Sequence, residues 1–447
     1  MSPPLILSLG IIGGNSLLYM TDAVKQNPTK LGDTTDISFA YGLSAIRLPL
    51  LNTLLFATLS LFGTSLFAQD NSAQSIKVGE GRITPALRLD FVNVDNTFRT
   101  DENLVDSTGL IVSPSVSWTA NRRLVEISAG YQGRYGAYSE SILNFDDHTL
   151  GLNVTANPRT RHQISGDFSI TRGHDELGTG QAIFAQNADE QIESTRVVLR
   201  TEYRYGAKNA QGQLGAGLFI SNELFSNLEE ITEGDDNTVV RPFALFSYRI
   251  SPDTRLVTEA RFGIFDFDED RRDRDQLSLL TGFDFSPTAR TGGRLRLGAT
   301  RDDFDTADES DTTTFVADIN VFYRLRSFSR IDLRLNRDLE TIDNSATGSG
   351  EVIVDDLRLT WAHEWSSRIS SRARYRIERF DRPCPAIDSR TNTLEFQVGV
   401  NVRRWLSVGV SVSDTRRDVE DSCDAPTDSG AEDFDLQRFG LFLTTTL

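Results

Sequence analysis

The feature that most constrains this chain is an alternation of apolar and polar side chains that begins near Arg82 and continues to the C-terminus. One example has Leu110, Val112, Pro114, Val116 and Trp118 as its apolar set and Ser113, Ser115, Ser117 and Thr119 between them. Each such segment has about ten residues, the length that a tilted β-strand needs to cross a bilayer. Strands in lipid must close on themselves, because lipid offers no hydrogen-bonding partner to an open sheet edge. The pattern therefore predicts a transmembrane β-barrel.

Counting the segments gives about eighteen strands, with sixteen as the alternative count. The expected strands start near Arg82, Gly109, Arg123, His148, Arg161, Thr195, Gln211, Thr238, Arg255, Gln276, Gly292, Thr312, Ser329, Val352, Ile369, Thr391, Trp405 and Asp435. Short turns such as 157–160 alternate with long acidic loops such as 302–311. This alternation places both ends of an antiparallel, up-and-down barrel on the short-turn side, which is periplasmic in bacteria. We expect this barrel to span residues 82–447.

A soluble β-sandwich or propeller is the alternative all-β fold, because turn-punctuated strands occur there too. The expected outward face of the barrel is apolar at Leu150, Leu152, Val154, Leu277, Leu279, Phe283, Phe315, Ile319, Val321, Leu394, Phe396, Val398 and Val400. Aromatic rings recur near the expected strand ends, at Trp118, Tyr203, Tyr205, Tyr248, Trp361, Trp365 and Tyr375. Rings of this kind are typical of the membrane–water boundary. The pattern favours the barrel.

The region before the barrel carries an export signal. Residues 47–68 combine the lone basic residue Arg47 with an apolar run, and they end at Ala68 before the polar residue Gln69. This arrangement predicts a cleaved signal peptide, with an N-terminal membrane anchor as the alternative. Residues 1–46 do not fit a signal peptide, so we expect translation to begin downstream of Met1. Residues 69–81 would then form a short periplasmic segment.

The chain is acidic, with a formal net charge of −18. This charge argues against a nucleic-acid partner, which would require a basic face, and it fits solvated extracellular loops. The only two cysteines, Cys384 and Cys423, fall in consecutive long loops. In an exported chain this placement predicts a disulfide between the loops, with two free thiols as the alternative.

The expected inward positions are polar and rich in arginine. The candidate pore-lining residues are Arg196, Arg200, Arg204, Arg294, Arg296, Arg330, Arg334, Arg372, Arg374 and Arg376. A barrel of about eighteen strands is too wide for side chains to fill, so these charges should border water. Arginine binds carboxylates and phosphates bidentately, which predicts a pathway for an anionic or sugar-like solute. Alternatively, the arginines pair with interleaved carboxylates such as Asp284 and Asp332 and only keep the lumen wet.

Other chemistry has little support in the sequence. The acidic loops 266–275 and 302–311 lack the ligand spacing of a calcium loop, so we expect them to be solvated and to form no metal site. The histidines are His148 and His174, expected in neighbouring outer loops, and His162 and His363, expected on the outward face near strand ends. No serine is marked out as a nucleophile by a local motif, so we expect neither an enzyme nor a cofactor.

Several motifs resemble a known family. They are residues 83–87, 95–101, 112–116, 146–152 and 171–175. They are similar to the family called Putative beta-barrel porin 2, outer-membrane proteins often linked to exopolysaccharide or capsule production. The resemblance implies a Gram-negative outer membrane, with lipid, the barrel assembly machinery and polysaccharide as partners. It implies no catalytic residue, and it leaves a monomer and a trimer open.

The C-terminus departs from barrels of this class, which commonly end in an aromatic residue that the assembly machinery reads. Here Leu447 shares the outward parity of Phe439, Leu441 and Leu443, and these four residues are the candidate assembly signal.

We expect an aqueous pore for polysaccharide or its fragments. The alternative is a non-conducting barrel that acts through its acidic loops. A plugged lumen would distinguish the second function from the first. The long segments 173–193 and 221–237 are the candidates for folding inward and plugging it.

Overall fold

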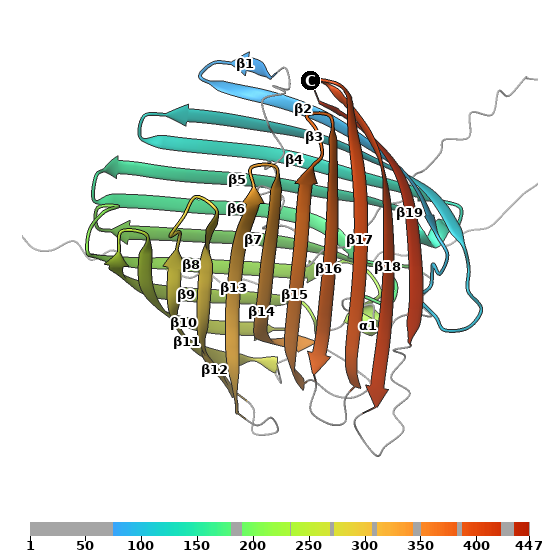
Figure 1. Ribbon diagram of the computed structural model, residues 1–447. Coiled ribbons are helices and arrows are strands. Elements are labelled where there is room, and N and C mark those ends of the chain that lie inside the picture. Colours follow the sequence, from blue (N-terminus) through green and yellow to red (C-terminus); the bar gives the residue numbers. More distant parts are fainter. Residues whose placement is uncertain are drawn as a thin grey trace, which may run out of the picture. The chain divides into compact units, whose positions relative to one another are not determined.

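A computed structural model describes residues 75–179, 190–232, 234–268, 272–305, 311–342, 350–381, 387–421 and 433–446. Each strand from β2 to β19 pairs antiparallel with its neighbours in chain order, and β19 pairs with β2. Figure 1 shows this closure, with the red strand β19 beside the blue strand β2. The described residues therefore form a closed, up-and-down barrel of eighteen strands, as predicted from the sequence.

The first half of the barrel consists of β2 (Gly81–Val94), β3 (Ser107–Arg122), β4 (Val125–Tyr138), β5 (Phe145–Arg159), β6 (His162–Asp175), β7 (Ile192–Tyr205), β8 (Gly212–Phe225), β9 (Asn237–Ser251) and β10 (Thr254–Phe267). The second half consists of β11 (Arg274–Phe285), β12 (Thr291–Phe304), β13 (Thr312–Arg326), β14 (Ser329–Ile342), β15 (Gly350–Glu364), β16 (Ile369–Asp381), β17 (Ile387–Arg403), β18 (Leu406–Asp421) and β19 (Phe434–Thr446). Every strand start lies within four residues of its expected position.

Three short elements were not expected. Strand β1 (Ile76–Val78) pairs with the start of β2, so that Ile76 lies opposite Ile83 at the short-turn end. A 3-10 turn (Ser141–Leu143) precedes β5, and the four-residue helix α1 (Glu229–Thr232) lies between β8 and β9. Within the described ranges, no helix is long and apolar enough to cross a membrane.

The two faces of the wall have opposite character. Along β11, the apolar residues Leu277 and Leu279 are 54% and 58% exposed, whereas the polar residues Gln276 and Ser278 are 3% exposed. A soluble fold would bury the apolar set and expose the polar set. The apolar face therefore points outward to lipid, and the soluble sandwich or propeller is wrong.

Aromatic residues gather on the outward face near the short turns. The ring of His363 lies 5.4 Å from that of Trp361 and 4.3 Å from that of Trp365. The indole N–H groups of Trp361 and Trp365 donate to Ser329 Oγ at 3.0 Å and Ser371 Oγ at 2.9 Å. Rings with one apolar face and one hydrogen-bonding edge suit the headgroup region. His363 therefore lies where the sequence placed it.

Two inward glycines permit a close approach between β11 and β12. A Cβ atom on Gly282 would lie 1.9 Å from the carbonyl oxygen of Leu295, and one on Gly298 would lie 2.0 Å from that of Leu279. Any side chain would collide with backbone at these distances. The two strands can keep this local geometry only with glycine at these positions.

Several predictions lie outside the described residues. They concern the leader 1–46, the signal peptide 47–68, the disulfide between Cys384 and Cys423, and the terminal residue Leu447. Of the other candidate assembly residues, Phe439 and Leu441 are each 48% exposed on the outward face of β19. Leu443 has the same parity and is half-buried.

Candidate solute pathway

The ten arginines that the sequence marked out all lie on the inward face. Arg296, Arg334 and Arg374 illustrate this placement, because each is adjacent in sequence to a lipid-facing residue. These neighbours are Leu297, Leu333 and Tyr375, which are 38%, 37% and 38% exposed. Successive side chains of a strand point to opposite faces, so the arginines point into the barrel.

Most of these arginines are paired with carboxylates. The pairs are Arg196–Glu223 at 3.8 Å, Arg204–Glu202 at 2.6 Å, Arg294–Asp318 at 3.3 Å, Arg296–Asp284 at 2.7 Å, Arg330–Asp332 at 2.5 Å, Arg374–Glu395 at 2.7 Å and Arg376–Glu378 at 2.6 Å. The pairs of Arg204, Arg330 and Arg376 join residues two apart on one strand. The expected charge pairing is therefore present, partly along strands and partly across them.

Two arginines differ from this pattern. Among the described residues, Arg200 and Arg334 make no ion pair. The guanidinium of Arg200 lies 4.8 Å from the ring centre of Phe243. Arg334 is exposed and lies directly opposite Arg358 in the register of β14 and β15. Both guanidinium groups are available to a solute in the lumen. Arg372 shares this inward face, opposite Gln397 on β17.

A cavity of about 1150 Å³ occupies the lumen near the short turns, bordered by residues from β5 to β14. Five of the ten predicted arginines line it: Arg200, Arg204, Arg294, Arg296 and Arg330. Carboxylates also line it, among them Asp167, Glu259 and Asp318, together with the rings of Phe285 and Phe322. The cavity thus offers charges of both signs and some apolar surface to the same solute.

The chain that follows β6 folds into the barrel. Residues 176–179, here called the inward segment, are contacted by arginines from distant parts of the chain. Arg99 Nη1, in the connection between β2 and β3, donates to the carbonyl oxygen of Leu177 at 2.5 Å. Arg417 Nη2, on the inward face of β18, donates to that of Gly178 at 2.6 Å. Five strands separate β6 from β18 around the wall, so the inward segment links two separate parts of the barrel.

Glu176 anchors the start of the inward segment. Its carboxylate makes an ion pair with Arg99, and it lies 3.8 Å from Arg438 on β19. Burial alone would raise the pKa of Glu176, but the guanidinium groups of Arg99 and Arg438 outweigh that effect and lower the pKa to about 2. The carboxylate is therefore ionised at any physiological pH. The described part of the segment 173–193 thus folds inward.

The second candidate for inward folding, segment 221–237, packs against its neighbours instead. Asp235 makes a buried ion pair of 2.6 Å with Arg272, whose guanidinium lies 4.3 Å from the ring centre of Phe267. The backbone N–H of Glu193 donates to Asn227 Oδ1 at 2.6 Å. These contacts hold the described part of the segment beside the adjacent connections, so it does not reach across the lumen.

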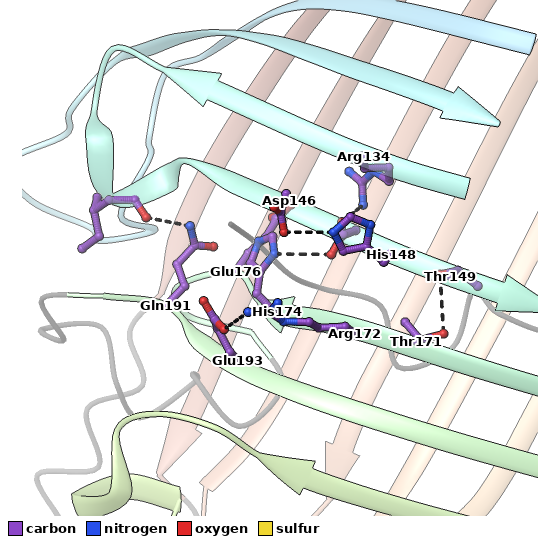
Figure 2. A network of polar contacts seen from close by, with 12 residues as sticks. Arg134, Asp146, His148, Thr149, Thr171, Arg172, His174, Glu176, Gln191 and Glu193 are labelled. Carbon is purple, nitrogen blue, oxygen red and sulfur yellow. Dashed lines mark hydrogen bonds and ion pairs between the residues drawn. The ribbon is translucent and has the colours of Figure 1, made fainter. Parts of the chain in front are cut away.

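The strand ends around Glu176 carry a polar network, shown in Figure 2. Arg134 on β4 pairs with Asp147 on β5 at 3.1 Å, and Arg172 on β6 pairs with Glu193 on β7 at 3.1 Å. The side-chain amide of Gln191 donates to the carbonyl oxygen of Ile142 at 2.6 Å. These contacts connect β4 to β7 at the end where the inward segment begins.

The placement of two histidines in outer loops was wrong. His148 lies within β5 and His174 within β6, because both strands extend further toward the long loops than the pattern indicated. His148 Nδ1 and Tyr131 Oη are 2.8 Å apart, joined by a hydrogen bond. His162 Nδ1 bonds in the same way to Tyr203 Oη at 2.7 Å. Among the described residues, no group of three or more His, Cys, Asp or Glu side chains is placed to hold a metal ion.

Sequence reasoning missed the residues that hold the inward segment. Arg417 and Arg438 lie on the inward parity of β18 and β19, so the same alternation that found the other arginines could have found them. Arg99 and Glu176 lie in connections, where no period marks a residue. Their roles depend on contacts between distant parts of the chain.

An eighteen-strand closed barrel with an apolar outer face and a charged lumen is a porin-like outer-membrane β-barrel. The chain belongs to the family Putative beta-barrel porin 2, whose model matches residues 71–431. This match confirms the resemblance described above.

Solved porins show a distant likeness that concerns the fold alone. Pseudomonas aeruginosa OccK2 (OpdF) is 11% identical, with a TM-score of 0.43 over 82% of this chain and 98% of that chain. Pseudomonas aeruginosa OprD is 11% identical, with a TM-score of 0.43 over 85% and 98%. Acinetobacter baumannii OccAB4 is 9% identical, with a TM-score of 0.42 over 84% and 100%. No curated protein matches this chain.

Proposed function

We propose that this barrel forms an aqueous pore in the outer membrane of a Gram-negative bacterium and passes anionic, sugar-like solutes such as an acidic exopolysaccharide or its fragments. The observation that carries the proposal is the lumenal cavity of about 1150 Å³ with seven arginines in its wall. Arginine supplies several N–H donors in a planar array, which suits the carboxylates and hydroxyls of acidic sugars.

A row of arginines across three strands extends this surface. In the register, Arg334 lies opposite Arg358, which lies opposite Arg376. Arg358 and Arg376 share the carboxylate of Asp356, at 3.2 and 3.1 Å, and Arg376 also pairs with Glu378. Three guanidinium groups thus face two carboxylates. The row retains a positive excess that would attract an anion along the wall.

The inward segment limits what could pass. Because it links the β6 side of the barrel to β18, it narrows the lumen on the long-loop side. Such a constriction fits an extended chain or a small solute and opposes the passage of bulky ones.

The same segment favours a second function. If the inward segment closes the lumen, the protein would be a non-conducting barrel that acts through its acidic loops. The contacts of Arg99 and Arg417 with Leu177 and Gly178 are the observation that favours this alternative.

Conductance in a planar bilayer separates the two functions, using refolded residues 69–447. The expected result is stepwise current that acidic oligosaccharides block. Replacing both Arg200 and Arg334 with Gln should weaken this block by roughly tenfold or more, since charge-assisted hydrogen bonds are lost. Arg416→Gln is the matched control, because Arg416 is exposed on the outer face and paired with Asp435. Insertion without current would contradict the pore and support the closed barrel.

A further inference from the structure

The outward face changes from apolar to charged near the long-loop ends of β14 to β18. On β16, Tyr375, Ile377 and Arg379 occupy successive outward positions, and Tyr375 is 38% exposed. On β17, Arg390 lies two outward positions beyond Leu394, which is 55% exposed. Adjacent outward residues are about 7 Å apart along a strand. The two arginines therefore lie just beyond the apolar band, at the level of the lipid headgroups of the outer leaflet.

The register places these arginines in one row of charged side chains. Arg337 lies opposite Asp355, Asp355 opposite Arg379, Arg379 opposite Arg390, and Arg390 opposite Asp418. The centre of the row is thus a direct pair of like charges, Arg379 and Arg390. Like charges directly opposite each other on one sheet face destabilise the pairing unless an anion lies between them.

The neighbouring arginines already have such an anion. Arg337 Nη1 donates to both carboxylate oxygens of Asp355, at 2.9 and 2.7 Å. Arg416 donates to both oxygens of Asp435, at 2.5 and 3.0 Å. These arginines are neutralised by bidentate or chelating contacts within the wall.

The central pair is not neutralised in this way. Arg379 is 51% exposed, and within the described ranges its one ion pair is with Asp381, at 3.7 Å. Arg390 is exposed, and it makes no hydrogen bond or ion pair with any described residue, including Asp418 opposite it. Arg379 and Arg390 are therefore two exposed arginines in neighbouring positions on the outward face, and the register places Asp355 and Asp418 on either side of the pair.

We propose that Arg379 and Arg390 bind one phosphate group of a phosphorylated glycolipid in the outer leaflet. The phosphate would accept hydrogen bonds from both guanidinium groups and separate their charges. The acyl chains of the same lipid would pack on the apolar side chains of Tyr375 and Leu394 below. The site needs only the outer-membrane location of the barrel, so it is independent of conduction.

Retention of lipid by the refolded barrel tests the site. The full mature barrel is mixed with diphosphoryl lipid A in detergent, and bound lipid is counted by native mass spectrometry. The variant carries Arg379→Gln and Arg390→Gln. The matched control carries Arg337→Gln and Arg416→Gln, which removes two outward arginines that have carboxylate partners. Heat-modifiable migration on a gel shows that each barrel is folded, and the single variant Arg390→Gln replaces the double variant if the latter does not fold.

The expected result is that wild type and control retain the lipid, whereas the variant retains it at least about tenfold less. Lipid A without phosphates should bind wild type as weakly as diphosphoryl lipid A binds the variant. Equal loss in control and variant would overturn the proposal, as would equal retention of phosphorylated and unphosphorylated lipid. Binding of inorganic phosphate to wild type as tight as that of diphosphoryl lipid A, and lost in the variant, would show a site for free phosphate and would also overturn it.

Discussion

Arg417 donates a hydrogen bond to the carbonyl oxygen of Gly178, which lies 239 residues earlier in the chain. The side chain of Arg417 is buried, and its guanidinium lies 4.8 Å from the ring centre of Phe434. A packed and preorganised donor therefore holds the inward segment on the β18 side of the lumen. The position of that segment depends on a few arginine contacts, so single substitutions should change the width of the lumen.

Replacing Arg417 with Gln should release the inward segment. The carbonyl of Gly178 would lose a charge-assisted hydrogen bond, a loss of about 1.5–3 kcal/mol in a buried setting. We expect larger single-channel conductance and more current noise than in wild type. The adjacent outward residue provides the control, since Arg416→Gln should leave both quantities unchanged. Identical traces for Arg417→Gln and wild type would show that this bond does not position the segment.

The pH dependence of the contact follows from the lowered pKa of Glu176. Its folded value of about 2 lies below the ordinary value of 4.5. The ionised contact therefore contributes its full stability above about pH 4.5 and loses it as the pH falls toward 2. Single-channel noise should stay constant from about pH 7 to pH 5 and should rise only in more acid solution. The Glu176→Gln variant should show this higher current noise already at neutral pH, and its noise should change little as the pH falls. A rise in wild-type noise near pH 6 would contradict this assignment.

Glycine at the β11–β12 contact is expected to be essential for stability. Gly282→Ala places a Cβ atom 1.9 Å from the carbonyl oxygen of Leu295. The strands would have to separate locally, at a cost of about 1–3 kcal/mol in the free energy of unfolding. Urea unfolding of the lipid-inserted barrel measures this change. Gly399→Ala is the control, because its Cβ atom would meet nothing closer than 3.7 Å. Equal stability of the two variants would show that the approach of β11 and β12 relaxes freely.

The strands and their faces could be predicted because every strand of a membrane barrel alternates lipid-facing apolar residues with lumen-facing polar ones. Leu277 and Leu279 alternate with Gln276 and Ser278 within a few residues, and that alternation alone assigns lipid and lumen. Same-strand pairs such as Arg330–Asp332 could also have been inferred, since residues two apart share a face. The register-dependent pairs were harder, because strand ends are uncertain by a few residues.

The inward segment could not be predicted for a different reason. Arg99, Glu176 and Arg417 come from three distant parts of the chain, and their contact exists only after the barrel has closed. No period or motif marks Glu176 as the anchor. A long loop with acidic residues has the same sequence pattern whether it lies over the lumen or in solvent.

The disulfide remains a prediction about Cys384 and Cys423. If it forms, non-reducing peptide mapping of the exported protein should give one cross-linked peptide pair that separates on reduction. Loss of the bond in a Cys384→Ser variant should increase protease cleavage in the two loops, because the constraint on their unfolded ensembles is removed. Thiol labelling of both cysteines in the unreduced protein would refute the pairing.

The C-terminal assembly signal also remains a prediction. Phe439 and Leu441 face lipid on β19, and Leu447 has the same parity. Leu447→Asp would place a charge at this position and should reduce the amount of folded barrel in the outer membrane severalfold. Leu447→Phe should restore or increase it. Unchanged insertion of the Leu447→Asp variant would show that the assembly machinery does not recognise this residue.

The pairing of β19 with β2 joins Arg438 to Val94 and Thr446 to Ala86. The chain is synthesised from its N-terminus, so the edge of β2 stays without this partner strand until β19 has also been made. The barrel cannot close in independent parts. A chain shortened by a single strand would keep two unpaired strand edges, which can pair with other chains. The yield of folded barrel thus depends on how long a nearly complete chain is kept from aggregating before β19 pairs with β2.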